Sequence, residues 1–324
     1  MKKFKLEDET MKTGKLFSVL LAFLCVAMLA ACQKMEQEAP PEEVVKAADS
    51  LWILTVQATK DPDTKSPDTK SMWVDESGDK EVLRYYWKST DKVKVFKDGD
   101  CIGTLNVFPT DGEHPTTATL SGSINANNLS VADELLLILP SDSWDYSKQN
   151  GILSGTGSIE ETCGFATATI SVTAKDEATH TISISNSASF TNQQSIYRFA
   201  FKLSGNSLSV KDFILNSANN SVVQKRTYGA SGWASTCGSI TVTMAEATND
   251  LIYVSLRNEN TAADTYTFIA TGSDDALILA SKSIPASVLN VAGKFITART
   301  IAAAKPDFGA GSGSETISSQ DQIY

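Results

Sequence analysis

The chain has 324 residues, of which 42% are hydrophobic, 20% charged and 8% aromatic, and its formal net charge is −10 at pH 7. These fractions are typical of globular proteins and exclude wholesale disorder, and the length suits two domains or one large β unit. The acidic charge argues against nucleic acid as a partner, because little positive charge is left to neutralise phosphates.

Residues 1–31 have the anatomy of a secretory signal peptide. Lysines precede an apolar run over residues 16–31, which is too short to span a bilayer comfortably. The run ends in Leu-Ala-Ala-Cys at residues 29–32, which resembles the lipobox of bacterial lipoproteins. The resemblance implies signal cleavage between Ala31 and Cys32, and lipid attachment at Cys32 with acyl chains such as palmitate. The alternative is an ordinary signal peptide in which the cysteine falls there by chance.

Residues 32–50 are expected to form a lipidated tether. The stretch 33–43 is acidic and contains prolines, which is typical of a flexible segment. Gln33 follows the cysteine where an Asp would indicate retention in the inner membrane. An acidic stretch at this place loosely resembles the surface-export signal of Bacteroidetes lipoproteins, which implies an outer-membrane lipoprotein at the cell surface.

A first strand is expected over residues 51–56, and a loop follows it. Within residues 61–70 the tetrapeptide Pro-Asp-Thr-Lys occurs twice, and proline and aspartate are turn residues. A calcium-binding loop is the alternative interpretation, but the segment lacks the Gly and the terminal Glu of an EF-hand.

The rest of the first half is predicted to be a series of strands. The Asp98-Gly99 pair between two of them is a strong hairpin signal, and the continuous apolar run 134–139 indicates a strand covered on both faces. A Ser/Asn/Gln-rich stretch over residues 185–195 breaks the pattern. The strands are expected at residues 81–87, 92–96, 101–107, 116–124, 134–139, 164–173 and 178–184.

The same pattern starts again in the second half and ends in a Gly/Ser-rich segment. The strands are expected at residues 196–203, 208–215, 222–225, 239–245, 251–256, 266–271, 276–281 and 295–301. Many short strands with turn clusters between them indicate an all-β fold of two tandem β-sandwich domains, over residues 51–190 and 191–302. Residues 303–324 are expected to be a flexible tail; the alternative is a segment that becomes ordered in a partner.

We find no catalytic or metal-binding motif in the sequence. There is no Gly-x-Ser-x-Gly elbow, and the two histidines offer little for a base or a metal site. The adjacent Glu160 and Glu161 are predicted to lie in a solvated turn. The five tryptophans are spread along the chain, which favours core packing over a sugar-binding platform. Three cysteines of the mature chain, at positions 101, 163 and 237, are predicted to be free, buried thiols.

The order of these features resembles the fimbrillin-like (Mfa-like) lipoproteins of Bacteroidetes, which are components of type V pili. The residues that carry the resemblance, after the lipobox, are Ala58-Thr59-Lys60, Thr64-Lys65, Trp87 with the valine-rich segment 91–96, and Ala292-Gly293-Lys294-Phe295 with Arg299-Thr300. The resemblance implies transthyretin-like, Greek-key sandwich domains, no enzymatic activity and no cofactor. It also implies assembly with other pilin subunits by strand addition, after a trypsin-like protease removes an N-terminal strand.

The resemblance gives four candidate cleavage residues after the first strand: Lys60, Lys65, Lys70 and Arg84. The polar tail departs from the pattern of a donor strand, because alternating large apolar residues are nearly absent from it. That leaves stalk, tip, anchor and accessory roles open, with adhesion to a host or bacterial surface ligand. The alternatives are a non-polymerising surface lipoprotein that binds glycan or host protein, and a secreted enzyme with an unfamiliar site.

Overall fold

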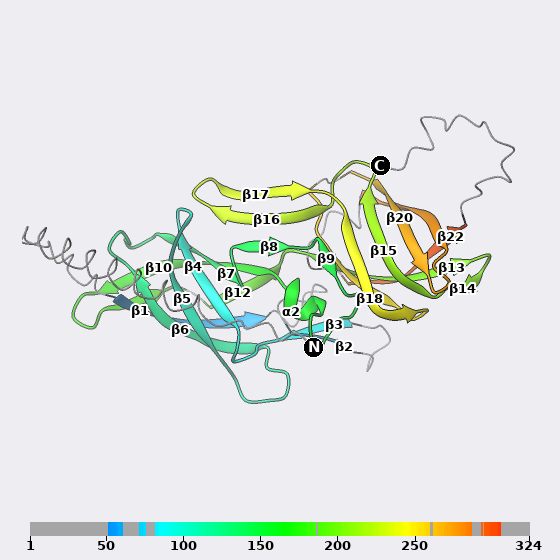
Figure 1. Cartoon of the computed structure of the whole chain (residues 1–324). Helices are drawn as coiled ribbons and strands as arrows, with labels where there is room; N and C mark the ends of the chain where they lie inside the picture. Colours follow the sequence, from blue (N-terminus) through cyan, green and yellow to red (C-terminus); the bar gives the residue numbers. More distant parts are fainter. Residues whose placement is uncertain are drawn as a thin grey trace, which may run out of the picture. The chain divides into compact units, whose positions relative to one another are not determined.

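The structure is a computed structural model that describes residues 51–60, 71–75, 82–185, 187–259, 262–286, 293 and 295–305 (Figure 1). The predicted signal peptide and tether therefore lie outside the described residues, and so do residues 306–324 of the predicted tail, Ala31, Cys32, Lys65 and Lys70. Residues 303 and 304, which were expected in the tail, belong to the last strand. All described residues lie in one unit, Ser50–Tyr324. Strands dominate it, and none of its described helices is long and apolar enough to cross a bilayer.

The first half of the unit contains these elements: β1 (Leu51–Lys60), β2 (Ser71–Asp75), β3 (Val82–Tyr86), β4 (Lys92–Lys97), β5 (Asp100–Pro109), β6 (Thr117–Asn125), β7 (Glu134–Leu139), β8 (Ser143–Asp145), β9 (Lys148–Gln149), α2 (Ile159–Thr162), β10 (Ala166–Asp176), β11 (Thr181–Ile184) and β12 (Ala188–Asn192). The second half contains these: β13 (Ser195–Leu203), β14 (Asn206–Ser207), β15 (Val210–Ser217), β16 (Val223–Gly229), β17 (Gly232–Cys237), β18 (Ile240–Thr248), β19 (Ile252–Leu256), β20 (Asp264–Gly272), β21 (Leu277–Ile284) and β22 (Phe295–Ala304). The predicted all-β fold is confirmed.

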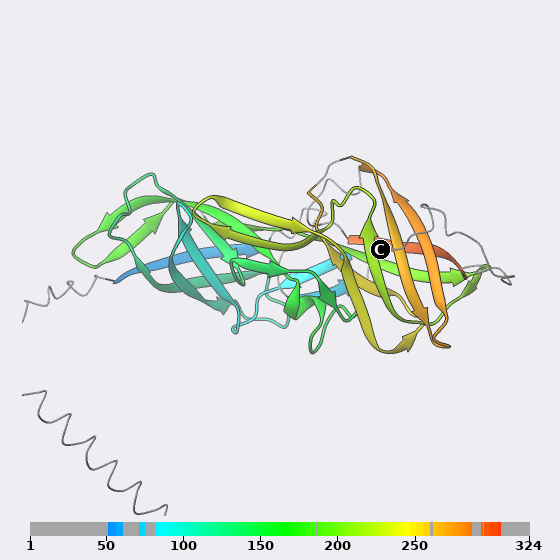
Figure 2. The same cartoon turned by 45° about the horizontal axis from the view of Figure 1, so that its top comes forward.

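The first large sheet closes on itself. Its strand order is β11-β1-β12-β10-β7-β4-β5-β6, and β1 also pairs with β6. The strands β1, β12, β10, β7, β4, β5 and β6 therefore form a ring with no free edge between them, and β1 is the strand that completes it (Figure 2). Inside the ring lies a core of buried aliphatic and aromatic side chains, which includes Trp52, Leu54, Val93, Leu105 and Leu137.

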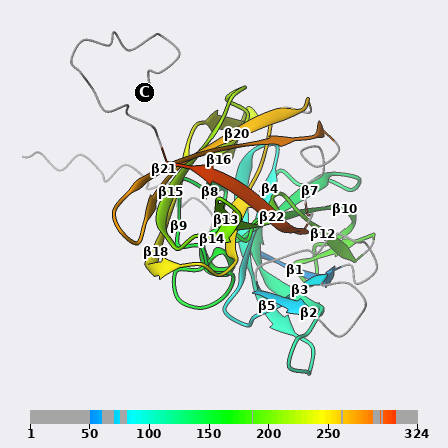
Figure 3. The same ribbon diagram turned by 90° about the vertical axis from the view of Figure 1, so that its right-hand side faces the viewer.

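The second large sheet follows the order β14-β13-β22-β21-β20-β15-β18-β9, and β19 pairs with the far edge of β13. Figure 3 shows β22 crossing the molecule between its neighbours β13 and β21. A buried glutamine joins the two ends of this sheet. Gln149 on β9 donates from Nε2 to the Ser255 carbonyl oxygen of β19 at 2.8 Å, and its Oε1 accepts from the Ser255 backbone N–H at 2.8 Å.

The hairpin of β16 and β17 packs on the outer face of the ring. It pairs with β8 in a three-stranded sheet, and the rings of Phe96 on β4 and Tyr228 on β16 meet edge-on at 5.2 Å. On β7, Leu137 points into the core of the ring whereas Ile138 belongs to a second core shared with the second large sheet. The prediction that this apolar strand is covered on both faces is confirmed.

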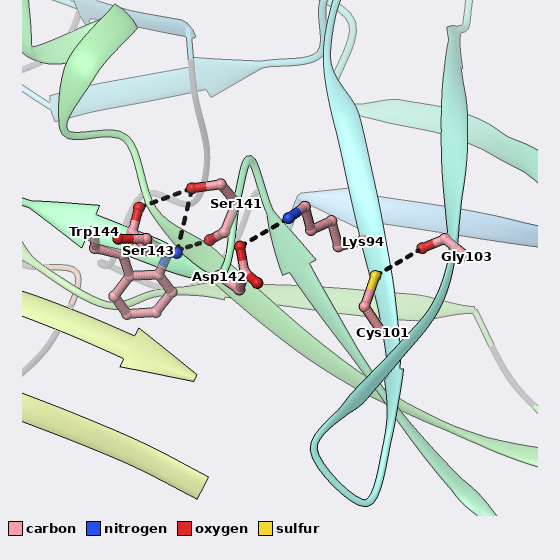
Figure 4. A network of polar contacts seen from close by, with 7 residues as sticks. All are labelled: Lys94, Cys101, Gly103, Ser141, Asp142, Ser143 and Trp144. Atoms are coloured by element: carbon pink, nitrogen blue, oxygen red, sulfur yellow. Dashed lines mark hydrogen bonds and ion pairs between the residues drawn. The ribbon is translucent and has the colours of Figure 1, made fainter. Parts of the chain in front are cut away.

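Side chains fix the turn between β7 and β8 (Figure 4). The Trp144 indole N–H donates to the Ser141 carbonyl oxygen at 2.6 Å, and Lys94 Nζ on β4 lies 2.7 Å from Asp142 Oδ1. The indole of Trp144 packs against that of Trp233 on β17, with ring centroids 4.1 Å apart. Trp52, Trp87 and Trp144 are buried, as expected of core tryptophans, and Trp233 is partly buried.

Three expectations from the sequence need correction, and the first two concern polar residues. The polar stretch 185–195 contains β12, which pairs with β1 and β10. Ala188, Phe190 and Asn192 are buried, whereas Ser189 and Thr191 are exposed. Glu160 is 3% exposed and forms an ion pair with Lys88, so it does not lie in a solvated turn.

The third correction concerns the cysteines, which are free, but only one of the three is buried. Burial raises the pKa of the Cys163 thiol to about 12, so this thiol stays protonated at neutral pH. Cys237 is half-buried and Cys101 is exposed. The prediction that the three thiols are free is confirmed. The prediction that they are buried is correct for Cys163 and wrong for Cys101 and Cys237.

Candidate functional site

The candidate site is the position that β1 occupies in the first sheet. The side chains of Trp52, Leu54, Val56 and Ala58 point into the core and are at most 2% exposed, whereas Leu51 on the outer face is 61% exposed. This alternation follows from the two-residue period of a strand, which sends successive side chains to opposite faces. One face of a single ten-residue strand thus supplies an inner stripe of apolar groups to the core.

On one side, β1 runs antiparallel to β6 over almost its full length. The register extends from Leu51 opposite Asn125 to Thr59 opposite Thr117. Polar side chains on the outer face also form hydrogen bonds between the two strands. Thr55 Oγ1 on β1 lies 3.1 Å from Ser121 Oγ on β6. The β6 side of the site is therefore a continuous backbone ladder with satisfied polar groups outside it.

On its other side, β1 runs parallel to two short strands. Leu54 lies opposite Ile182 of β11, and Ala58 lies opposite Ala188 of β12. The backbone N–H of Ile53 adds a hydrogen bond to the His180 carbonyl oxygen at 2.8 Å. Because β1 is paired along both edges, its removal would leave two open strand edges and an uncovered apolar core.

At the N-terminal end of β1, an aromatic side chain of β1 itself fills the ring. The Trp52 indole lies 5.1 Å from the His180 ring between centroids. Lys175 Nζ lies over the same indole, 4.4 Å from its centroid, and also donates to the Ala126 carbonyl oxygen at 3.1 Å. The ammonium group and the aromatic face attract each other. We call the position that β1 occupies between β6, β11 and β12 the seat of β1, and this end of the seat is suited to a large aromatic ring.

At the C-terminal end of β1, the surrounding strands supply the aromatic groups. Trp87 and Phe190 meet edge-on with ring centroids 5.2 Å apart, and Phe190 lies opposite Lys60 in the ladder. Ala58 on β1 lies between Ala118 on β6 and Ala188 on β12. This end of the seat therefore takes a small side chain.

The candidate cleavage residues lie at different kinds of position. Lys60 is the last residue of β1, and Arg84 lies inside β3, half-buried and opposite Trp73 of β2. Proteases act on exposed segments that can leave their hydrogen-bonded pairing, so a strand interior is a poor substrate. Lys65 and Lys70 lie between β1 and β2, outside the described residues.

The buried ionisable groups belong to the fold. The described residues contain no cluster of three His, Cys, Asp or Glu side chains that could hold a metal ion. Asp264 is 4% exposed; burial alone would raise its pKa, but hydrogen bonds from the Ser217 and Ser221 hydroxyls, with backbone N–H groups, hold the pKa below its usual value. It ties the start of β20 to the loop after β15.

No family model matches the sequence, and no curated protein does. Among solved structures, the chain is similar to a putative cell adhesion protein from Bacteroides uniformis, with 12% identity and a TM-score of 0.36 over 72% of this chain and 84% of that one. It is also similar to a fimbrial assembly protein from Parabacteroides distasonis, with 8% identity and a TM-score of 0.32 over 75% and 87% of the two chains. A third similar structure is the tip fimbrial protein Mfa3 from Porphyromonas gingivalis with C-terminal truncation, with 11% identity and a TM-score of 0.29 over 72% and 81%.

Proposed function

We propose that this chain is a non-enzymatic fimbrial subunit of a bacterial cell surface that assembles by strand addition and contributes to adhesion. The observation that carries the proposal is the place of β1. This strand completes a closed ring, is paired along both edges, and is followed by a segment with basic residues. In the proposal, Cys32 carries the lipid that anchors the precursor in the outer membrane, and Ala31 is the last residue of the signal peptide.

Removing β1 would create a strong drive to bind another strand. Burying a Trp, Leu or Val side chain stabilises by roughly 1.5–3 kcal/mol each, and β1 buries one of each. The open edges of β6 and β12 would also lack backbone partners. A strand from another subunit that fills the same seat recovers both contributions, which is the physics of strand addition.

The same geometry favours some candidate cleavage residues over others. Cleavage after Lys60, Lys65 or Lys70 separates β1 from the rest of the chain and leaves the β2–β3 hairpin whole. Cleavage after Arg84 would divide β3 and remove β2. We therefore favour the three lysines over Arg84.

A gel of unboiled surface extract, probed for this protein, tests the proposal. We expect a ladder or a high-mass band, and mass spectrometry of that band should find an N-terminus just after Lys60, Lys65 or Lys70. A single monomer band that still begins at an acylated Cys32 would contradict strand exchange by this chain. A variant in which all three lysines are Gln serves as the control and should stay monomeric.

Lipid anchoring has its own test. Cys32→Ala should move the protein from the membrane fraction to the soluble fraction, because the acyl chains contribute roughly 0.8 kcal/mol per buried methylene. Cys101→Ala is the matched control, since that exposed thiol lies in the folded body and should not affect the partition. Membrane association that survives Cys32→Ala would exclude lipid anchoring at this residue.

A further inference from the structure

The seat of β1 is graded in size from one end to the other. Its inward residues decrease in volume in chain order, from Trp52 through Leu54 and Val56 to Ala58, and all are at most 2% exposed. Resting on the proposed strand exchange, we infer that the seat selects its partner strand by this gradient. The partner is a strand of another protein chain with the pattern aromatic-x-Leu-x-Val-x-Ala.

The aromatic end of the gradient is built around a ring from the inserted strand. The His180 ring is tilted against the Trp52 indole with centroids 5.1 Å apart, and Lys175 Nζ lies 4.4 Å from the indole centroid. Both residues come from the surrounding strands or their turn. A smaller side chain at this place would leave a cavity the size of an indole and remove the contact with the ammonium group. Truncating a buried tryptophan is among the most destabilising changes in a core.

The side-chain sizes that fit in the middle and at the small end of the seat are set by the residues opposite them in the β6 ladder and by the nearby aromatic rings. Leu54 lies opposite Gly122, which has no side chain to compete for the space, and Val56 lies opposite the buried Leu120. At Ala58 the ring already holds the Trp87 and Phe190 pair at the same end. A large residue there would overpack the core and weaken the binding of the strand.

The tail of this chain does not fit the gradient. Its aromatic residues beyond β22 are Phe308 and Tyr324. The alternate residues after Phe308 are Ala310, Ser312 and Ser314. Residues 303–324 contain neither Leu nor Val, so no register of this segment places them in the two middle positions, and the segment does not fit the seat as its donor.

The experiment uses the mature chain with a recognition site for a sequence-specific protease in place of residues 62–68. After cleavage, β1 is held without a covalent bond to the ring, and labelled peptides compete for its seat. The first peptide has the sequence of Leu51–Lys60. The second has the same composition with the Trp and the Ala exchanged, and the third is the segment 302–324. Peptide binding is followed by fluorescence anisotropy and release of β1 by native mass spectrometry.

We expect the first peptide to displace β1 and to bind at least about 100-fold more tightly than the second, from the costs of the cavity and of overpacking combined. Equal affinity within about threefold would overturn the size gradient while leaving strand exchange intact. Binding of segment 302–324 as tight as that of the first peptide would overturn the exclusion of this segment as the donor. If none of the peptides displaces β1, the proposed strand exchange fails, and the inference fails with it.

Discussion

At the scale of single residues, β1 divides into side chains that hold the ring and side chains that do not. Trp52 is 2% exposed and Leu51, its neighbour in sequence, is 61% exposed. Trp52→Ala should lower the free energy of unfolding by about 3–5 kcal/mol, whereas Leu51→Ala should change it by less than about 0.5 kcal/mol. Urea denaturation of both variants measures the difference. Equal effects would mean that the two faces of β1 are not distinguished in solution.

Asp264 makes the stability of the second sheet depend on pH. Its folded-state pKa is depressed, since hydroxyl and backbone hydrogen bonds to the carboxylate outweigh the effect of burial. The stabilisation is therefore present above the unfolded pKa of about 3.9 and is lost as the pH falls through the lower folded pKa. Asp264→Asn should cost about 1–3 kcal/mol at pH 7, and the cost should shrink below about pH 4.

Thermal melts of Asp264→Asn between pH 2 and pH 7 measure this dependence. The matched control is Asp111→Asn in an exposed loop, which should leave the profile unchanged. A cost that stays constant down to pH 2 would show that the charge of Asp264 is not what stabilises the site.

At the scale of elements, the tip of the β16–β17 hairpin rests on the turn between β4 and β5. A Cβ added to Gly99 would collide with the Cα of Ala230 and lie 2.6 Å from the Gly229 carbonyl oxygen, and Gly99 has φ +91°. Gly232 has a similar φ of +82° with open space around it. Ala at either position meets the same backbone strain, so the difference between the two variants isolates the contact with the hairpin.

We expect Gly99→Ala to destabilise the protein by about 1–3 kcal/mol more than Gly232→Ala does. The free energies of unfolding from denaturant titration give this comparison. Equal destabilisation would mean that the hairpin does not rest on the turn. Hydrogen exchange should locate the loss in Gly99→Ala at the β16–β17 backbone, because that hairpin would have to lift from the ring.

The elements also differ in how well the sequence predicts them. β1 and β7 are predicted well, because a run of β-forming residues in one and an apolar run in the other are local patterns. β12 is missed, because Phe190 is its one large apolar residue and four of its five residues are Ala, Ser, Thr or Asn. Its inward–outward alternation is present, but pairing with β1 and β10 is what makes it a strand. That pairing joins segments far apart in the sequence, which local propensity does not reveal.

At the scale of the whole unit, the two large sheets share a core. The cluster that fills the second sheet also contains Phe96, Ile138 and Trp144 from the first half of the chain. The predicted division into two domains, over residues 51–190 and 191–302, stays a prediction. We expect the unit to unfold in one transition, with the calorimetric enthalpy equal to the van't Hoff enthalpy, because neither half buries this core alone. Two resolved transitions would contradict this.

The sequence by itself determined the all-β class, the first strand and the basic residues after it, because each is a short-range pattern of side-chain type. Only the tertiary structure decided that β1 closes a ring between β6 and β12, that the seat narrows from Trp52 to Ala58, and that Glu160 is buried against Lys88. These features depend on which strands become neighbours. Neighbouring strands are chosen by the combined fit of many side chains across the core, and no local segment of the sequence contains that information.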